Sequence, residues 1–160
     1  MPGSYCYDGS NYSCPPNAVS GSGAQSYLDC TCRAGFMNMS TQSAEGMCQD
    51  CLADHYCFGG GHIEACVNDS YSPSQSRNSS SCTCNMGFTG IRNSPCVECV
   101  SPTYCYSGLG AVCPTGSIST NRSWSISNCT CNAGRYGMQG TRVYCLVTPG
   151  RREVGQIGKR

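Results

Sequence analysis

The sequence predicts a small, disulfide-rich fold of three tandem modules, with short irregular β-hairpins, little helix and an extended, rod-like shape. Cysteine supplies 17 of the 160 residues, whereas Leu, Ile, Val and Phe together supply only 20. So few large apolar side chains cannot build an ordinary core, and small secreted domains replace that core with loops closed by disulfides. Gly or Pro interrupts most candidate helical periods. The cysteines also recur in a threefold pattern, which indicates modules.

Each repeat contains the tripeptide Cys-Thr-Cys, with a glycine three residues after it and another cysteine sixteen residues before it. The glycines are Gly35, Gly87 and Gly134. An aromatic-Cys-aromatic triplet stands upstream in each repeat, at Tyr5–Tyr7, Tyr56–Phe58 and Tyr104–Tyr106. A period of 47 to 52 residues this regular predicts tandem modules that contact mainly their neighbours.

We place module 1 at residues 1–48, module 2 at 51–96, module 3 at 99–145 and a basic tail at 146–160. The linkers Cys48–Cys51 and Cys96–Cys99 each hold only two residues between cysteines. A connection this short, held by disulfides at both ends, cannot act as a flexible tether. We therefore expect stiff joints.

The net charge and the cysteine content limit the cellular compartment and the binding partners that can be expected for this protein. The net charge of +1 argues against nucleic acid or anionic membranes as partners. No run of 18 apolar residues is present to span a membrane. Structural disulfides persist outside the cell and in the secretory lumen, so we expect an extracellular protein, secreted or at the cell surface. The first 20 residues do not read as a signal peptide, which suggests a mature or cut fragment.

The half-motif Cys-x-Cys-x-x-Gly-aromatic, followed by a later cysteine, resembles the C-terminal half of an EGF-like module. Cys84–Phe88 matches it best, and the third copy shifts the aromatic residue by one, to Tyr136. The stretch from Cys14 to Phe36 also resembles the cysteine-rich region of ephrin-receptor-like ectodomains. The resemblance covers residues 5–145 and implies a fold but no single function, since such modules serve both as spacers and as binders.

The EGF-like resemblance implies that the first cysteine pairs with the third, the second with the fourth and the fifth with the sixth. The implied disulfides are Cys6–Cys30, Cys32–Cys48, Cys51–Cys66, Cys57–Cys82, Cys84–Cys96, Cys99–Cys113, Cys105–Cys129 and Cys131–Cys145. Module 1 has five cysteines and lacks its first, which would fall just before Met1, so Cys14 is left unpaired. Either more protein precedes residue 1, or Cys14 bonds to another chain. Six cysteines allow 15 connectivities, so the sequence alone cannot prove this scheme.

Asn-x-Ser/Thr sequons predict N-glycosylation. They lie at Asn11, Asn38, Asn68, Asn78, Asn121 and Asn128. We expect about three to five of them to carry glycan. Asn128 is the poorest candidate because its middle residue, Cys129, is expected to be locked in a disulfide.

No catalytic, cofactor or metal site is predicted. Thiolates at Cys48, Cys51, Cys96 and Cys99 would suit zinc, but the repeat assigns them to successive modules. Single acids before the first cysteines, Asp50 and Glu98, supply too few hard oxygen ligands for tight calcium binding. The only histidines, His55 and His62, have no matching nucleophile and acid. We therefore expect no enzymatic activity.

Three further features suggest contacts. In each aromatic triplet we expect one ring to pack on its own disulfide and the other to be free for a neighbour. Trp124 is either a local cap or an exposed contact. Residues 151–160 carry a net charge of +3 against −2 for the rest. They form either a solvated end or a segment that docks on the next subunit, helped by Val154 and Ile157.

These observations favour a structural subunit or repeat segment of an extracellular, glycosylated, disulfide-stapled fibre or cell-surface appendage. Head-to-tail contacts between copies would give an open homopolymer. The alternative is a ligand-binding fragment of a receptor or adhesion ectodomain. That alternative predicts a localised, sugar-free patch of Tyr and Trp on one module, whereas a fibre predicts modified faces along all three.

Overall fold

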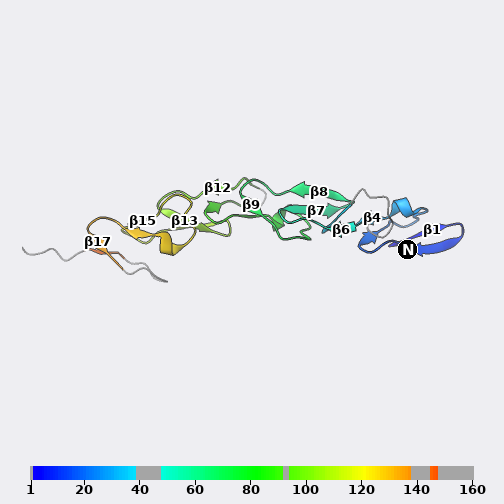
Figure 1. Ribbon diagram of the computed structural model, residues 1–160, viewed down its shortest axis with the longest axis horizontal. Helices are drawn as coiled ribbons and strands as arrows, with labels where there is room; N and C mark the ends of the chain where they lie inside the picture. Colours follow the sequence, from blue (N-terminus) through cyan, green and yellow to red (C-terminus); the bar gives the residue numbers. More distant parts are fainter. Residues whose placement is uncertain (1, 39–47, 92–93, 138–144, 148–160) are drawn as a thin grey trace, which may run out of the picture.

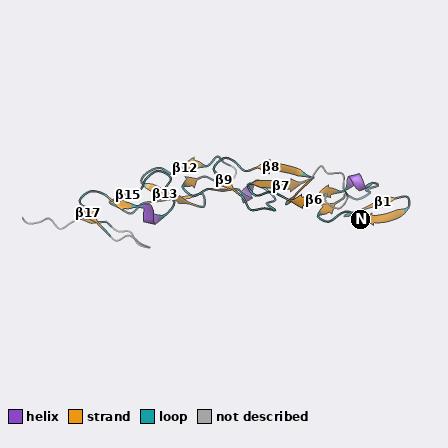
Figure 2. Ribbon diagram, viewed as in Figure 1, coloured by secondary structure: helices purple, strands orange, loops and turns teal. Residues whose placement is uncertain are grey.

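The computed structural model describes residues 2–38, 48–91, 94–137 and 145–147. Strands of two to five residues alternate with turns, and the elements follow one another in chain order along the long axis, as Figure 1 shows from β1 to β17. Figure 2 shows how little of the ribbon is helical. The fold is therefore small, β-rich and disulfide-stapled.

Each repeat contains three antiparallel hairpins of different kinds, and the third takes one strand wholly or mostly from residues predicted as linker or tail, at 48–50, 97–98 and 146–147. The aromatic hairpins carry the triplets: β1 (Ser4–Tyr7) with β2 (Ser10–Ser13), β7 (His55–Gly59) with β8 (His62–Ala65), and β13 (Thr103–Tyr106) with β14 (Leu109–Val112). The inner pairs hold the Cys-Thr-Cys tripeptides: β3 (Ala18–Val19) with β4 (Thr31–Cys32), β9 (Ser70–Tyr71) with β10 (Thr83–Cys84), and β15 (Ser117–Ile118) with β16 (Thr130–Cys131). The closing pairs end the modules: β5 (Phe36–Asn38) with β6 (Cys48–Asp50), β11 (Phe88–Thr89) with β12 (Val97–Glu98), and β17 (Arg135–Tyr136) with β18 (Leu146–Val147).

A 3₁₀ turn precedes every Cys-Thr-Cys tripeptide. The three turns are η1 (Tyr27–Asp29), η3 (Ser79–Ser81) and η4 (Ile126–Asn128). Each begins at a polar N-cap, and capping by Ser, Asn or Asp is the common way to satisfy exposed N–H groups at a helix start. In η1 and η4 the cap is reciprocal, from Ser26 with Asp29 and from Ser125 with Asn128. Within the described residues, no helix is long and apolar enough to cross a membrane.

Cysteine forms the interior. Apart from Ala18, every buried hydrophobic residue in the described part of the chain is a cysteine. Six of them, at positions 30, 32, 51, 57, 105 and 129, are at most 1% exposed. The disulfides thus occupy the place that aliphatic side chains hold in larger domains.

The disulfides pair first with second, third with fourth and fifth with sixth. They are Cys14–Cys30, Cys32–Cys48, Cys51–Cys57, Cys66–Cys82, Cys84–Cys96, Cys99–Cys105, Cys113–Cys129 and Cys131–Cys145. The three expected fifth–sixth pairs are present. The remaining expected pairs are wrong: Cys6–Cys30, Cys51–Cys66, Cys57–Cys82, Cys99–Cys113 and Cys105–Cys129.

The local chain path explains this pairing. A turn through Asp54, whose φ is 61°, folds β7 back onto the start of module 2, so the Cα atoms of Cys51 and Cys57 lie 5.8 Å apart. The loop between the third and the fourth cysteine folds back through a 3₁₀ turn. In module 1 this brings the Cα atoms of Cys14 and Cys30 to 5.7 Å from each other. Cys14 is therefore paired within its module, and the expectation that it is unpaired is wrong. The free thiol is Cys6, which is exposed.

A buried serine recurs on the inner side of each aromatic hairpin. Ser20, Ser72 and Ser119 donate their hydroxyls to the carbonyls of Ser4, His55 and Thr103 at 2.7, 2.8 and 2.7 Å. All three are at most 7% exposed. Each bond satisfies a strand carbonyl and ties the sixteen-residue loop to its hairpin.

Candidate functional site

The joint between modules 1 and 2 is built from backbone. Gly35 donates its N–H to the carbonyl of Cys57 at 2.8 Å and accepts from the N–H of Cys51 at 2.9 Å. The tip of the β7–β8 hairpin also reaches back over module 1, where Gly60 donates to the carbonyl of Cys32 at 2.8 Å. Backbone N–H and C=O groups need hydrogen-bond partners, and here they find them across the boundary between consecutive modules.

The joint between modules 2 and 3 repeats this arrangement. Gly87 donates to the carbonyl of Cys105 at 3.0 Å and accepts from the N–H of Cys99 at 2.8 Å. The hairpin tip again overlaps the preceding module, since the hydroxyl of Thr89 donates to the carbonyl of Gly108 at 2.9 Å. The glycine bonds thus use equivalent atoms in both joints, whereas the hairpin tips are held by different ones.

Glycine is required at the centre of each joint. Gly35 and Gly87 have φ values of 93° and 84°, and a Cβ at either would stand 2.9 Å from the carbonyl oxygen of Gln75 or 2.6 Å from that of Arg122. The spacing of these glycines is visible in the sequence, but their close approach to the next module is not. Only a residue without a side chain allows two backbones to meet this closely.

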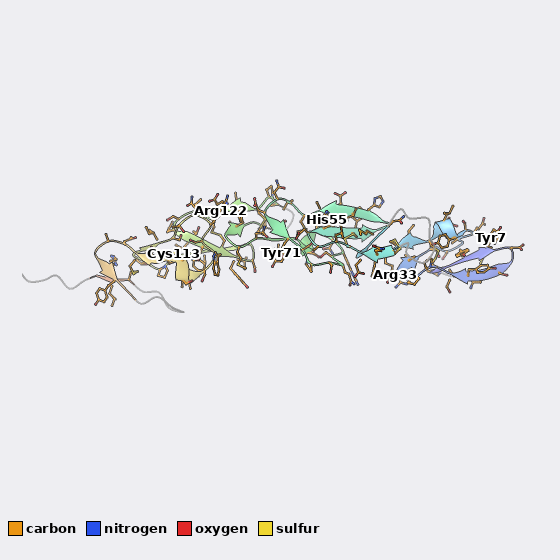
Figure 3. The ribbon with its side chains drawn as sticks, in the orientation of Figure 1. Tyr7, Arg33, His55, Tyr71, Cys113 and Arg122 are labelled. Carbon is orange, nitrogen blue, oxygen red and sulfur yellow. A yellow bond between two sulfur atoms is a disulfide. The ribbon has the colours of Figure 1, made fainter. Side chains whose placement is uncertain are left out.

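The second joint also carries a charged contact. The guanidinium carbon of Arg122 lies 5.3 Å from the ring centroid of Phe88, and its Nε lies 3.4 Å from an oxygen of Glu98. The side chains of Arg122 and Glu98 are 65% and 38% exposed. Solvent screening therefore keeps the ion pair to a small contribution. Figure 3 shows Arg122 on the surface between these modules.

An open groove of about 1160 Å³ lies along modules 2 and 3. Its lining includes Val67, Ile91, Val97 and Leu109, and the last three are 79%, 62% and 76% exposed. The hydroxyls of Ser79 and Ser80 add polar groups to its wall. An exposed apolar strip rimmed by polar groups is typical of a contact surface.

In each aromatic triplet the first ring is half-buried and the second is exposed, but the expected packing of the inner ring on the disulfide of its own triplet is wrong for Tyr5, because Cys6 forms none. The outer rings of Tyr7, Phe58 and Tyr106 are 66%, 53% and 60% exposed. Among the inner rings, Tyr104 packs against the cysteine cluster of module 3, and Tyr5 stacks on Tyr12 with centroids 5.5 Å apart.

Trp124 takes part in a local cap and is also exposed, so both alternatives for this residue hold. Its backbone N–H donates to the Asn128 side chain at 3.3 Å, within the cap of η4. Its side chain stays 48% exposed. The indole therefore remains available as a contact beside a local cap.

The sequon asparagines differ in their surroundings. Asn11, Asn38, Asn68, Asn78 and Asn121 are exposed, although the Ser40 that completes the Asn38 sequon lies outside the described residues. Asn128 is half-buried, and its side-chain oxygen accepts from the N–H of Ser125 at 3.0 Å. Its neighbour Cys129 is 1% exposed and disulfide-bonded. The structure thus separates Asn128 from the other five by geometry.

The histidines and cysteines considered as catalytic or metal-binding residues have structural partners. His62 stacks on Phe58 with ring centroids 5.3 Å apart, and Nδ1 of His55 lies 2.9 Å from the carbonyl of Ala53. Cys48, Cys51, Cys96 and Cys99 each form a disulfide. Across the described ranges, no three His, Cys, Asp or Glu side chains gather as metal ligands.

The tail of residues 151–160, with Val154 and Ile157, lies outside the described residues, so its expected docking stays a prediction. The modules and their joints are therefore the candidate site. Comparisons with family models, with curated proteins and with solved structures find no match to this chain.

Proposed function

We propose that this protein is a non-enzymatic structural subunit of an extracellular, glycosylated fibre or cell-surface appendage. Its cysteine-rich modules would form a stiff rod that assembles head to tail into a homopolymer. The observation that carries the proposal is the repeated joint, in which Gly35 and Gly87 bond to the next module through equivalent backbone atoms. A hinge between domains would instead leave few contacts across a flexible linker.

The cysteine-filled interior supports an extracellular setting. Disulfides are stable there, and they hold the modules together without a large apolar core. The exposed sequons give five positions at which glycan would sheath the rod along its length. Enzymatic activity has no place in this proposal, since the two histidines already serve in stacking and in a turn.

Small-angle X-ray scattering of the dilute, oxidised protein tests the rod. A compact 160-residue globule has a radius of gyration of about 15 Å. We expect a clearly larger value with an asymmetric pair-distance distribution and a thin cross-section. A value near that of the globule would contradict the proposal, and the reduced protein, expanded and without a defined cross-section, is the control.

Electron microscopy of native secreted material tests the fibre. Antibodies to this chain should label filaments at regular intervals along their length. Label confined to single particles at the cell surface would contradict the fibre and favour a receptor or adhesion fragment.

The groove along modules 2 and 3 gives that second candidate its specific support. Exposed Ile91 and Leu109 would contact an apolar ligand there. Under the receptor proposal, the double variant Ile91→Ser, Leu109→Ser loses ligand binding while scattering stays unchanged. Under the fibre proposal, it leaves filaments intact.

A further inference from the structure

We propose that Tyr5 and Tyr12 form a modification site, at which a haem peroxidase and hydrogen peroxide join the two phenol rings into dityrosine. The site lies in the β1–β2 hairpin of module 1, and the new bond closes that hairpin as a covalent staple. Both tyrosines belong to one hairpin of one chain, so the site does not depend on the proposed fibre.

The two rings are neighbours across the hairpin. The register of β1 with β2 sets Tyr5 directly opposite Tyr12, so both side chains stand on the same face of the sheet. Their ring centroids lie 5.5 Å apart, and the ring planes make an angle of 21°. Stacked rings at this separation are a favoured aromatic arrangement. The fold therefore brings two oxidisable phenols together before any oxidant arrives.

A third tyrosine packs on the inner ring of the pair. Tyr27, in the η1 turn, meets Tyr5 edge to face, with centroids 6.2 Å apart and an angle of 83° between the planes. Tyr5 and Tyr27 are half-buried, whereas Tyr12 is 45% exposed. Tyr5 thus contacts two rings, and Tyr12 is the member of the stacked pair that is more open to an oxidant.

The ring geometry favours coupling of Tyr5 with Tyr12 over coupling with Tyr27. Removing one electron and the hydroxyl proton from a phenol leaves an unpaired electron in the π system, with density on the carbons next to the hydroxyl-bearing carbon. The lobes of that system project perpendicular to the ring. In nearly parallel rings the lobes of two radicals point toward each other, whereas in an edge-to-face pair the lobe of one ring meets the C–H edge of the other.

The reaction balances with hydrogen peroxide as the oxidant. Each phenol gives its hydroxyl proton and one electron to the oxidant. The two unpaired electrons then pair as a carbon–carbon bond between one Cε atom of Tyr5 and one of Tyr12. Each bonded carbon releases its hydrogen as a proton and each phenolic oxygen takes one up, which restores both aromatic rings. Hydrogen peroxide accepts two electrons and two protons and becomes two molecules of water.

The equivalent hairpins do not repeat the pair. Glu64 stands opposite Tyr56 in module 2, and Ala111 stands opposite Tyr104 in module 3. An inner tyrosine therefore occurs in all three modules, but only in module 1 does the cross-strand position hold a second phenol. Modules 2 and 3 act as internal controls within the same molecule.

Oxidation of the full chain at low protein concentration tests the site. Cys6 is first blocked with iodoacetamide, because its exposed thiol would reduce tyrosyl radicals. Cys6 pairs with Asn11 on the other face of the hairpin, so the block leaves the stacked rings in place. After treatment with a haem peroxidase and hydrogen peroxide, the monomer should lose the mass of two hydrogen atoms and gain dityrosine fluorescence.

Peptide mapping locates the bond. After reduction of the disulfides, cleavage before Asp8 separates Tyr5 from Tyr12 in the untreated chain. In the oxidised chain the two peptides should stay joined, because thiols do not reduce a carbon–carbon bond. Fragmentation of the joined peptides should place the link on Tyr5 and Tyr12.

Two variants separate this pair from the other tyrosines. Tyr12→Phe keeps an aromatic ring in the stack but has no hydroxyl from which the radical forms, so it should lose both the mass change and the fluorescence. Tyr7→Phe is the matched control, since Tyr7 lies on the same hairpin, opposite Ser10, and is 66% exposed. Figure 3 labels Tyr7 on this hairpin. This control should couple as the unmodified protein does.

Four results would overturn the proposed site. Coupling that persists in Tyr12→Phe, or a map that joins Tyr5 to Tyr27, would assign the link to another pair. Linked dimers without the monomeric product would show that the stacked rings do not couple with each other. Native material should carry the Tyr5–Tyr12 link, and a native map with only separate peptides would reject the modification. None of these results bears on the scattering test of the proposed rod.

Discussion

The carbonyl oxygen of Arg122 lies 2.6 Å from the point where a side chain would begin at Gly87. Gly87→Ala should therefore destabilise the chain by more than the about 1–2 kcal/mol that left-handed backbone costs an L-residue. Gly23→Ala isolates that backbone cost, because its φ of 83° is similar and no described atom lies within 4 Å of its Cβ position. Urea unfolding of the dilute, oxidised proteins measures both. Equal losses for the two variants would show that the joint adds nothing.

The buried serine hydroxyls should contribute to stability. Ser72→Ala removes the donor to the carbonyl of His55 from a site that is 2% exposed. Leaving that carbonyl unsatisfied should cost about 1–3 kcal/mol. Ser74→Ala, at an exposed position in the same loop, is the control and should change the unfolding free energy little. An unfolding midpoint for Ser72→Ala equal to that of Ser74→Ala would show that the hydrogen bond from Ser72 to His55 does not stabilise the fold.

A single thiol should react under native conditions. Iodoacetamide should modify Cys6 alone, since the other sixteen cysteines form disulfides. Peptide mapping without reduction should also recover Cys51 linked to Cys57 across a cut at Asp54. Label on Cys14, or a Cys51–Cys66 link, would restore the EGF-like pairing and reject the observed one.

The cap at Asn128 should tolerate a carboxylate. Asn128→Asp keeps the side-chain oxygen that bonds the N–H of Ser125 and reproduces the Asp29 cap of module 1, so stability should be retained. Asn128→Ala removes the acceptor for the N–H of Ser125 and should lose about 1 kcal/mol, the contribution of one hydrogen bond. Glycopeptide analysis should also find Asn128 unmodified, and an occupied Asn128 would be incompatible with the packed cap.

The charged contact at the second joint should be weak and sensitive to salt. Glu98→Gln removes one charge of a pair whose partner, Arg122, is 65% exposed, so the loss should stay below about 1 kcal/mol. That loss should shrink further in high salt. A loss above that bound, or one that is independent of salt, would contradict an exposed ion pair. Thermal unfolding at two salt concentrations measures it.

The positions of the repeats were predictable, because the spacing between their cysteines and glycines can be counted directly along the sequence. The Cys-Thr-Cys tripeptides, Gly35 and Gly87 all occupy equivalent places in the structure. The disulfide partners were not predictable from the resemblance, because pairing follows the local path of the chain. One usable signal was the constant spacing of 6 residues between Cys51 and Cys57 and between Cys99 and Cys105. Had those cysteines been paired, the missing first cysteine of module 1 would have left Cys6 free rather than Cys14.

The joints were harder to predict than the modules. The sequence indicates stiffness through its two-residue linkers, but the contact of Gly87 with Arg122 joins residues 35 positions apart. No sequence pattern predicts this contact, because it depends on how far the hairpin of the next module extends back over the preceding one. The buried serines were missed for a related reason: Ser20, Ser72 and Ser119 stand among many serines and are distinguished only by burial.

The register of the β1–β2 hairpin sets Asn11 directly opposite Cys6, so both side chains stand on one face of the hairpin. The equivalent of Asn11 in module 3 is Gly110, where a Cβ would stand 3.7 Å from the Thr89 hydroxyl of module 2. A glycan on Asn11 would therefore stand beside the exposed thiol of Cys6 and restrict the approach of other molecules to it. The fraction modified at one asparagine would then set how fast that thiol reacts.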